Sequence, residues 1–265
     1  MKNPASTDCH TFVVLAYGDS PYIDACIRSL ISQTIRSRIV ISTSTVSPFL
    51  YETAERYDLP LHIGKSSTCI AEDWSFAFNL AQTPYLTLAH QDDLYSSNYT
   101  ECCLNEMRNP ETVLVFSDYA ELISNLTRRM SVLLGIKRLI LSLFFIWKNR
   151  VRSPMLKKWM LAIGNPICCP SIMYNKDKIG DFTFNTDFIM NLDWDATLRM
   201  AEIPGNFVYI RRILLTRRLH PESGTAHATK SDARSREDLK IIRRYWPKFL
   251  ADIYCRVYSI SHKLN

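Results

Sequence analysis

Glycine is scarce in this chain, which has seven among its 265 residues. The turn after the first apolar segment, Ala16-Tyr17-Gly18-Asp19-Ser20, contains one of them. The G-x-G-x-x-G dinucleotide fingerprint and the P-loop both need several glycines at this point, because the backbone has to approach phosphate groups closely. The sequence therefore disfavours a Rossmann dehydrogenase and a P-loop kinase.

The chain also lacks long apolar segments. Residues 1–10 are polar, and the apolar run Phe12–Leu15 is too short for a signal sequence. A second apolar run, Leu139–Trp147, is well short of the roughly 20 residues that span a bilayer. We therefore expect a cytoplasmic protein.

Cysteine is not scarce, but its spacing argues against a zinc site. The eight cysteines include the adjacent pairs Cys102-Cys103 and Cys168-Cys169, and none are spaced as C-x-x-C. We expect most of them to be buried thiols in a reducing compartment.

Acidic residues are missing from a long central stretch. Between Glu121 and Asp177 the chain has no Asp or Glu but ten Lys and Arg, although its net charge is only +6. Residues 122–167 form a basic insert around the apolar run 139–147. Two interpretations stay open: a helix lying in the interface of an anionic membrane, or a flap packed on the protein with a solvated basic face. No nucleic-acid-binding module is recognisable, so we expect no nucleic-acid partner.

Strand and helix patterns alternate along the first half of the chain. The sequence predicts strands over residues 11–17, 38–42, 61–63, from 85, and over 112–116, with helices over 22–33, 48–57, 71–80 and from 98. Such alternation is typical of α/β proteins, in which helices cover both faces of a mostly parallel sheet.

One of these strands, which begins at Tyr85, runs through His90 and Gln91 into the adjacent carboxylates Asp92 and Asp93. In open α/β sheets the ligand crevice lies beyond the carboxyl ends of the strands. Two neighbouring carboxylates repel each other unless a cation neutralises them, and oxygen ligands suit Mg²⁺ or Mn²⁺ shared with substrate phosphates. The alternative is a turn that caps the next helix, because residues 96–98 (Ser-Ser-Asn) also suit a helix start.

Four ordered segments of the N-terminal half resemble a family 2 glycosyltransferase of the GT-A fold. They are residues 12–18, the S-L-x-x-Q-T helix at 27–34, the N-W-x-x-A-type helix at 71–77, and the strand and acidic pair at 85–94. The resemblance covers residues 11–118 and resumes at 168–225. It implies a nucleotide-binding sheet in which Asp93 binds a divalent metal and Asp92 makes a second contact. His90 stands where many members of the family have the first Asp.

Residues 191–200 resemble the family's E-D-x-D-L-x-x-R helix, whose general base matches Asp193. A carboxylate there would take the proton of an acceptor hydroxyl as it attacks the anomeric carbon in an inverting transfer. Leu192 replaces the usual Glu. Asp195 does not share a helical face with Asp193, so it is either a separate acceptor contact or a stabilising charge at the helix N-terminus.

Residues 206–210 have the pattern of a strand. Downstream of it, residues 217–225 resemble the family's R-x-H-x-x-S-x-T segment. By this resemblance His220 completes the metal shell or lies near the diphosphate, and Arg218 offsets phosphate charge. Residues 169–174 correspond to the strand before the acceptor site, with Ser171 as its polar contact.

The resemblance also implies a nucleotide-sugar donor, a UDP-sugar by default and a dTDP-sugar next. Its contacts are expected at Ala16, Tyr17, Thr43, Asp73, Asp92 and Arg218. The family commonly ends its second strand with an Asp that reads the nucleobase, whereas residues 41–45 (Ile-Ser-Thr-Ser-Thr) offer only hydroxyls.

We therefore expect an inverting glycosyltransferase that uses Mn²⁺ or Mg²⁺ and a glycan or lipid-linked acceptor in surface polysaccharide synthesis. A catalytically silent nucleotide-sugar-binding relative and a membrane-surface adaptor are the alternatives, and the protein would lie on the inner face of the cell membrane if the basic insert binds lipid. The expected organisation is a catalytic domain over 1–225, interrupted by the insert at 122–167, and a helical tail over 226–265.

Overall fold

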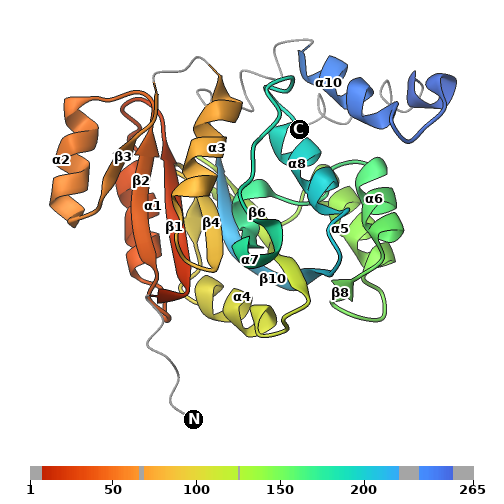
Figure 1. Ribbon diagram of the computed structural model, residues 1–265, viewed down its shortest axis with the longest axis horizontal. Helices are drawn as coiled ribbons and strands as arrows, with labels where there is room; N and C mark the ends of the chain where they lie inside the picture. The colour runs from red at the N-terminus through yellow and green to blue at the C-terminus, as the bar shows by residue number, and fades with distance from the viewer. Residues whose placement is uncertain (1–7, 66–68, 125, 221–232, 253–265) are drawn as a thin grey trace.

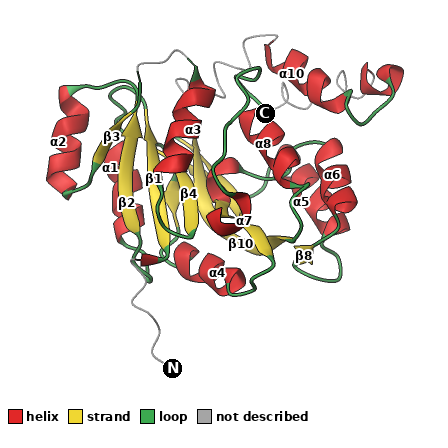
Figure 2. Ribbon diagram, in the orientation of Figure 1, coloured by secondary structure: helices red, strands yellow, loops and turns green. Residues whose placement is uncertain are grey.

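A computed structural model of the chain describes residues 8–65, 69–124, 126–220 and 233–252 (Figure 1). A ten-stranded sheet forms the centre, and helices lie on both sides of it (Figure 2). This confirms the α/β prediction. Residues 221–232, which hold the end of the R-x-H-x-x-S-x-T segment, and residues 253–265 lie outside the described part.

The first four strands pair in parallel, in the order β3-β2-β1-β4. They are β1 (His10–Ala16), β2 (Arg38–Thr43), β3 (Leu61–Ile63) and β4 (Tyr85–His90), and helices α1 (Ile23–Ile31), α2 (Pro48–Tyr57) and α3 (Ile70–Leu80) connect them. The register places Ala16 beside Thr43 and Leu15 beside His90, so the ends of β1, β2 and β4 meet at one edge of the sheet.

The second half of the sheet includes a strand of opposite direction. β9 (Ile172–Asn175) lies between β4 and β6 (Thr112–Ile123) and is antiparallel to both. β6 runs parallel to β10 (Asn206–Leu219), which pairs with β5 (Leu94–Tyr95) at the end of the sheet. The short strands β7 (Leu126–Arg128) and β8 (Arg150–Val151) pair with β6 and β10.

β6 and β10 both continue beyond the short strands predicted at 112–116 and 206–210. They stay paired through register shifts between Ile210 and Leu215, and this continuation brings Arg217 and Arg218 to the carboxyl edge of the sheet. A bulge of this kind lets a strand bend without losing its partner. The sequence pattern stops at the bulge because alternation is interrupted there.

The remaining helices follow the chain around the second half of the sheet. They are α4 (Tyr99–Met107), α5 (Val132–Phe144), α6 (Pro154–Ala162), α7 (Lys176–Ile179), α8 (Leu192–Met200) and α10 (Ala233–Ile242), with a 3-10 turn, η2, at Cys169–Ser171. Three helix starts have a serine whose side chain accepts the N–H three residues on: Ser47, Ser131 and Ser153. Pro48 and Pro154 follow two of these serines at the first helical position, where a missing N–H does no harm.

Two apolar cores lie on the two faces of the sheet. Phe12 and Val14 of β1 pack with α1, α2 and α4, while Val13, between them, packs with α3, α6 and α8. Alternate strand residues point to opposite faces, so one strand serves both cores.

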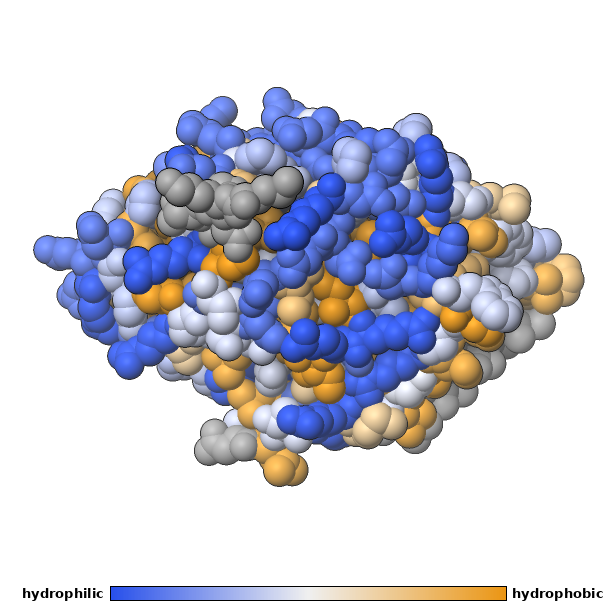
Figure 3. Space-filling model, turned by 90° about the horizontal axis from the view of Figure 1, so that it is seen from below, coloured by the Kyte–Doolittle hydropathy of each residue, from blue (hydrophilic) through white to orange (hydrophobic). Residues whose placement is uncertain are grey.

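The basic insert folds as β7, α5, β8 and α6. Leu141 and Phe145 are buried in one of the two cores, whereas the outer side of α5 and the turn after it expose Val132, Leu139, Leu143, Ile146 and Trp147. In a second view, apolar side chains reach the surface at the end of the molecule where α5 and α6 lie (Figure 3). Of the helices in the described ranges, none is long and apolar enough to cross a membrane.

Candidate active site

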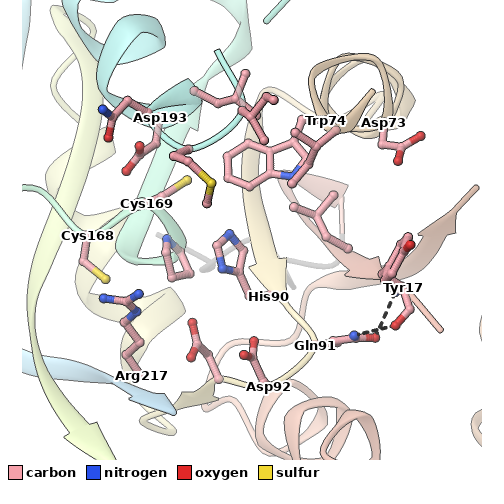
Figure 4. A pocket seen from close by; sticks show the side chains of 18 of the residues that line it. Tyr17, Asp73, Trp74, His90, Gln91, Asp92, Cys168, Cys169, Asp193 and Arg217 are labelled. Carbon is pink, nitrogen blue, oxygen red and sulfur yellow. Dashed lines mark hydrogen bonds between the residues drawn. The ribbon is translucent and has the colours of Figure 1, made fainter. Parts of the chain in front are cut away.

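A cavity of about 720 Å³ opens where β1, β2 and β4 end (Figure 4). Its walls come from these strand ends, from α3, from the segment before α8, and from the ends of β10 and α10. Nine of the residues selected from the sequence line it: Ala16, Tyr17, Thr43, Asp73, Asp92, Asp93, Asp193, Arg218 and His220.

The end of β4 carries a cluster that could hold a metal ion. His90, Asp92 and Asp93 each offer one ligand atom within 4.8 Å of the others. We call these three residues the metal-type cluster. Nε2 of His90 and Oδ2 of Asp93 are buried, and neither has a hydrogen-bond partner among the described residues. Because unpaired buried polar atoms are costly, these residues fit a bound divalent cation. One imidazole and two carboxylates suit Mn²⁺ better than Mg²⁺, which prefers oxygen ligands alone.

Burial sets the protonation of this cluster. It raises the pKa of Asp93 well above its ordinary value, and the neighbouring charge of Asp92 raises it further. Burial lowers the pKa of His90 to about 4, so the ring is neutral at pH 7. A neutral imidazole is the form that binds metal ions.

His220 contacts this cluster but is not one of its three members. Its Nε2 lies 3.1 Å from Oδ2 of Asp92, and its ring packs against Tyr22 with the centroids 4.8 Å apart. The backbone N–H of Arg218 donates to Oδ1 of Asp93 at 2.9 Å. By the resemblance His220 completes the metal shell or lies near the diphosphate. In the structure it contacts Asp92, and His90 is the third member of the cluster of possible ligands, so the role of His220 stays a prediction.

The wall near β1 and β2 presents an exposed ring and several hydroxyls. The N–H of Tyr17 donates to Oε1 of Gln91 at 3.1 Å, and Nε2 of Gln91 donates to the Tyr17 carbonyl at 2.9 Å (Figure 4). This pair of bonds fixes the loop and leaves the Tyr17 side chain 70% exposed. Gly18 has a φ of +58°, which suits glycine, and its N–H donates to Oγ1 of Thr45 at 2.9 Å.

Asp73 faces the same wall from α3. The hydroxyl of Ser44 donates to its Oδ2 at 2.8 Å, and burial raises the pKa of Asp73. The next residue, Trp74, packs its ring 5.3 Å from that of His90 and so connects this wall to the metal-type cluster.

Asp193 lies across the cavity from Asp92, and Cys168 and Cys169 are on the wall between them (Figure 4). It is in the first turn of α8, where Oδ1 accepts the N–H of Trp194 at 2.8 Å and Oδ2 accepts Nδ2 of Asn165 at 3.0 Å. Burial raises the pKa of Asp193, and the nearby charges of Arg234 and Lys137 oppose that rise. A buried, oriented carboxyl with a raised pKa suits a proton acceptor.

The structure does not bring two of the expected acceptor contacts to the cavity. Ser171 is buried in η2, where its hydroxyl donates to the Cys168 carbonyl at 2.7 Å. Asp195 is buried on the other side of α8 and pairs with Arg199 at 3.2 Å and Arg244 at 2.7 Å. The 3-10 turn and the helical twist direct these side chains away, so Asp195 is held as a structural charge.

Several cavity residues come from segments that sequence reasoning placed outside the site. Lys137 and Asn165 belong to the basic insert, and Arg234 and Asp238 belong to the C-terminal tail. Arg217 also lines the cavity, and the sequence did carry a signal for it, because it directly precedes the motif residue Arg218. Lys137, Asn165, Arg234 and Asp238 reach the cavity only through the way the insert and the tail pack against the sheet. The local sequence pattern does not predict such packing.

No family model matches the chain, and no curated protein matches it. Several solved structures, in contrast, are similar to it in fold. TarS residues 1–349 from S. aureus, in complex with UDP-GlcNAc, has a TM-score of 0.66 at 11% identity over 93% of this chain and 70% of that one. The mannosyltransferase PcManGT from Pyrobaculum calidifontis, in complex with GDP-Man and Mn²⁺, has a TM-score of 0.63 at 12% identity over 93% of this chain and 69% of that one. A longer TarS structure has a TM-score of 0.59 at 12% identity, and the match covers 93% of this chain and 42% of that one. The chain therefore has the GT-A-type fold of these glycosyltransferases, as the sequence resemblance predicts.

Proposed function

We propose that this chain is an inverting, metal-dependent glycosyltransferase that moves a sugar from a nucleoside-diphosphate donor to a hydroxyl of a glycan or lipid-linked acceptor. The observation that carries the proposal is one cavity with two kinds of acid site: the His90, Asp92 and Asp93 cluster, and the separate carboxyl of Asp193. Solved structures of the same fold bind UDP, UDP-GlcNAc and GDP-Man with Mn²⁺, which supports a donor of this class.

The metal-type cluster accounts for binding of the donor diphosphate. His90, Asp92 and Asp93 would hold Mn²⁺ or Mg²⁺, which neutralises diphosphate charge and stabilises the leaving group when bound. Arg218 lines the same end of the cavity, and its Nε donates to the carbonyl of Asp92 at 3.2 Å. With Arg217, it adds positive charge where the diphosphate departs.

Asp193 accounts for activation of the acceptor. Its carboxylate takes the proton of the acceptor hydroxyl while the hydroxyl oxygen forms a bond to the anomeric carbon. The bond from that carbon to the diphosphate oxygen breaks on the opposite side, its electron pair leaves with the diphosphate, and the configuration inverts. The hydrogen bonds from Trp194 and Asn165 hold the carboxylate in one orientation for this step.

The exposed ring of Tyr17 and the hydroxyls of Thr43 and Ser44 support a nucleoside site at the ends of β1 and β2. An aromatic ring offers a stacking surface to a base, and hydroxyls can donate or accept. Because the hydroxyls do not select one base, a UDP-sugar is the first donor to test and a dTDP-sugar the second.

The test is turnover of a nucleotide-sugar panel with Mn²⁺, Mg²⁺ and chelator in parallel. The proposal is supported if release of UDP or dTDP needs metal. Asp193→Asn should lower this release strongly, whereas Asp187→Asn, on the exposed loop, should not. Binding of UDP without sugar transfer under all conditions would favour a catalytically silent relative, which His90 and Leu192 at motif positions make the second candidate.

We also propose that the outer side of α5 places the protein on an anionic membrane surface, on its cytoplasmic side, as a route to lipid-linked acceptors. The exposed apolar residues of α5 recur at 132, 136, 139 and 143, so they share one helical face. Ile146 and Trp147 are exposed in the turn after the helix, and Trp147 is 91% exposed. Several cations of the insert pair with acids elsewhere: Arg128 with Glu121, Arg138 with Asp118, and Arg152 with Glu111. Apolar contact therefore carries more of this binding than net charge does.

A further inference from the structure

Arg234 is a cavity residue that the proposed reaction does not yet use. It lies in the first turn of α10 and lines the cavity with Asp193. Its Nε is buried and has no hydrogen-bond partner among the described residues. A guanidinium nitrogen left unpaired away from water is costly, so this donor favours an acceptor group that enters the cavity.

The position of Arg234 is fixed by the helix that carries it. Glu237 of α10 accepts the backbone N–H groups of Ile189 at 2.8 Å and of Met190 and Asn191 at 2.9 Å. The side chain of Asn191 also donates to Oδ1 of Asp238 at 2.8 Å. Residues 234, 237 and 238 share one face of a helix, so these bonds orient Arg234 toward the cavity.

Arg217 is shared between the two ends of the cavity, because its charge acts on both Asp93 and Asp193. Asp92 and Arg218 also act on Asp93, at the metal-type cluster. Arg234 acts on Asp193 and Asp238. Burial raises the pKa of Asp193, and it raises the pKa of Asp238 to about 6. In both cases the positive charge of Arg234 opposes the rise. Arg234 therefore belongs to the end of the cavity where the general base lies, away from the donor diphosphate.

We propose that Arg234 binds an anionic group of the acceptor, a phosphate or a carboxylate close to the hydroxyl that receives the sugar. This inference rests on the proposed function, because it takes the Asp193 end of the cavity as the acceptor side. The planar guanidinium binds two anionic oxygens side by side, which the Nε donor makes possible here. The donor's own negative charge would be matched at the other end by a cation held in the metal-type cluster and by Arg218.

The test compares three matched acceptor analogues: methyl glucoside, its 6-phosphate, and methyl glucuronide. Their binding to the protein saturated with UDP and Mn²⁺ is measured by calorimetry for the wild type, Arg234→Gln, Arg234→Lys and Arg236→Gln. Arg236 is exposed on the same helix and does not line the cavity, so it is the matched control.

We expect Arg234→Gln to weaken binding of one or both anionic analogues by roughly ten- to a hundredfold, the range for a hydrogen bond to a charged group. Arg234→Lys should restore part of it, and UDP binding and the weak binding of the neutral glucoside should not change. The analogue that responds identifies phosphate or carboxylate.

Two results would overturn the inference: anionic analogues that bind no better than the neutral one, or an equal effect of Arg234→Gln on UDP binding. Sugar transfer is measured separately. Binding that depends on Arg234 without transfer from any donor would reject the proposed function and its acceptor side, and would leave Arg234 as an anion-binding residue of the cavity.

Discussion

The acidic and histidine side chains of the cavity differ in whether their buried polar atoms have hydrogen-bond partners. Asp93 and His90 each have one buried atom without a partner in the described structure, whereas both carboxylate oxygens of Asp193 accept hydrogen bonds. Asp93 and His90 therefore favour a ligand with positive charge. Asp193 is held in one orientation and favours exchange of a proton.

Asp93→Asn is expected to remove metal-dependent donor binding, because a neutral amide lowers the negative charge that faces the cation. Calorimetry should show weaker UDP binding with Mn²⁺ and little change without it. Asp58→Asn is the control, since Asp58 ends α2 with a φ of 51°, a conformation that Asn also adopts. The same UDP affinity in Asp93→Asn and wild type at every Mn²⁺ concentration would contradict the metal assignment.

Asp193→Asn should keep donor binding and lower the rate of sugar transfer by roughly the 10²–10⁴-fold that general-base catalysis supplies. Asp195→Asn should reduce the rate less and lower the melting temperature more, since it removes the buried partner of Arg199 and Arg244. Initial rates and thermal unfolding measure the two effects. The reverse ranking of rates would mean that the base lies two residues later.

The pH dependence of kcat/KM follows from the raised pKa of Asp193. Burial favours the protonated form, which cannot act as a base, so activity should rise with pH through a pKa above the ordinary ~4 of an aspartate. The charge of Lys137 lowers this pKa, so Lys137→Gln should move the acid limb to higher pH. Lys148→Gln, on the exposed turn after α5, should leave the limb in place, and a shift of equal size in both variants would count against this origin.

At the scale of helices and strands, local sequence predicts the N-terminal half of the sheet well. The bounds predicted for α2 and β3 agree with the structure residue by residue, since serine and proline mark the start of one and flanking turns mark the other. The direction of β9 was not predictable: a four-residue buried strand looks alike in parallel and antiparallel pairing. The full length of β6 and β10 was missed because each strand is supported by the other beyond the core.

The bonds between α10 and the segment before α8 should matter for catalysis. Glu237→Gln replaces a carboxylate that accepts three N–H groups at the start of the helix carrying Asp193, so we expect kcat to fall roughly tenfold or more. KM for the donor should stay unchanged, because none of the charges that act on Asp93 belongs to α10. Lys240→Gln, which removes an exposed ion pair with Asp187 from the same helix, is the control. A parallel loss of donor affinity would indicate a general loosening of the fold instead.

The whole cavity depends on chain segments that lie far apart in sequence. Most of the residues expected to bind the donor, together with Asp193, line the cavity, because strand ends and helix starts carry recognisable residues. Their roles stay predictions. Lys137, Asn165, Arg234 and Asp238 could not be predicted, since each reaches the cavity only through packing of the insert or the tail against the sheet. The division into a catalytic domain, an insert and a tail stays a prediction.

Membrane association concerns the outer surface of the molecule. The protein should sediment with anionic vesicles, and Leu143→Ser with Trp147→Ser should remove most of this binding, since both side chains are exposed on α5 or just after it. Salt should weaken binding only in part, because several nearby cations are already paired. Tyr51→Ser, at an exposed aromatic residue of α2, is the control. Absence of sedimentation at low salt would leave α5 as a packed flap.

The place of β9 in the sheet also sets an order in time. During synthesis β4 and β6 are both complete by residue 123, yet β9, which joins them, is not made until residue 175, and β10 not until residue 219. Until then the nascent chain holds two pieces of sheet with open edges, which other chains can pair with. Fragments that end before β9 are therefore expected to aggregate, and chaperone contact with the growing chain should last until β10 has left the ribosome.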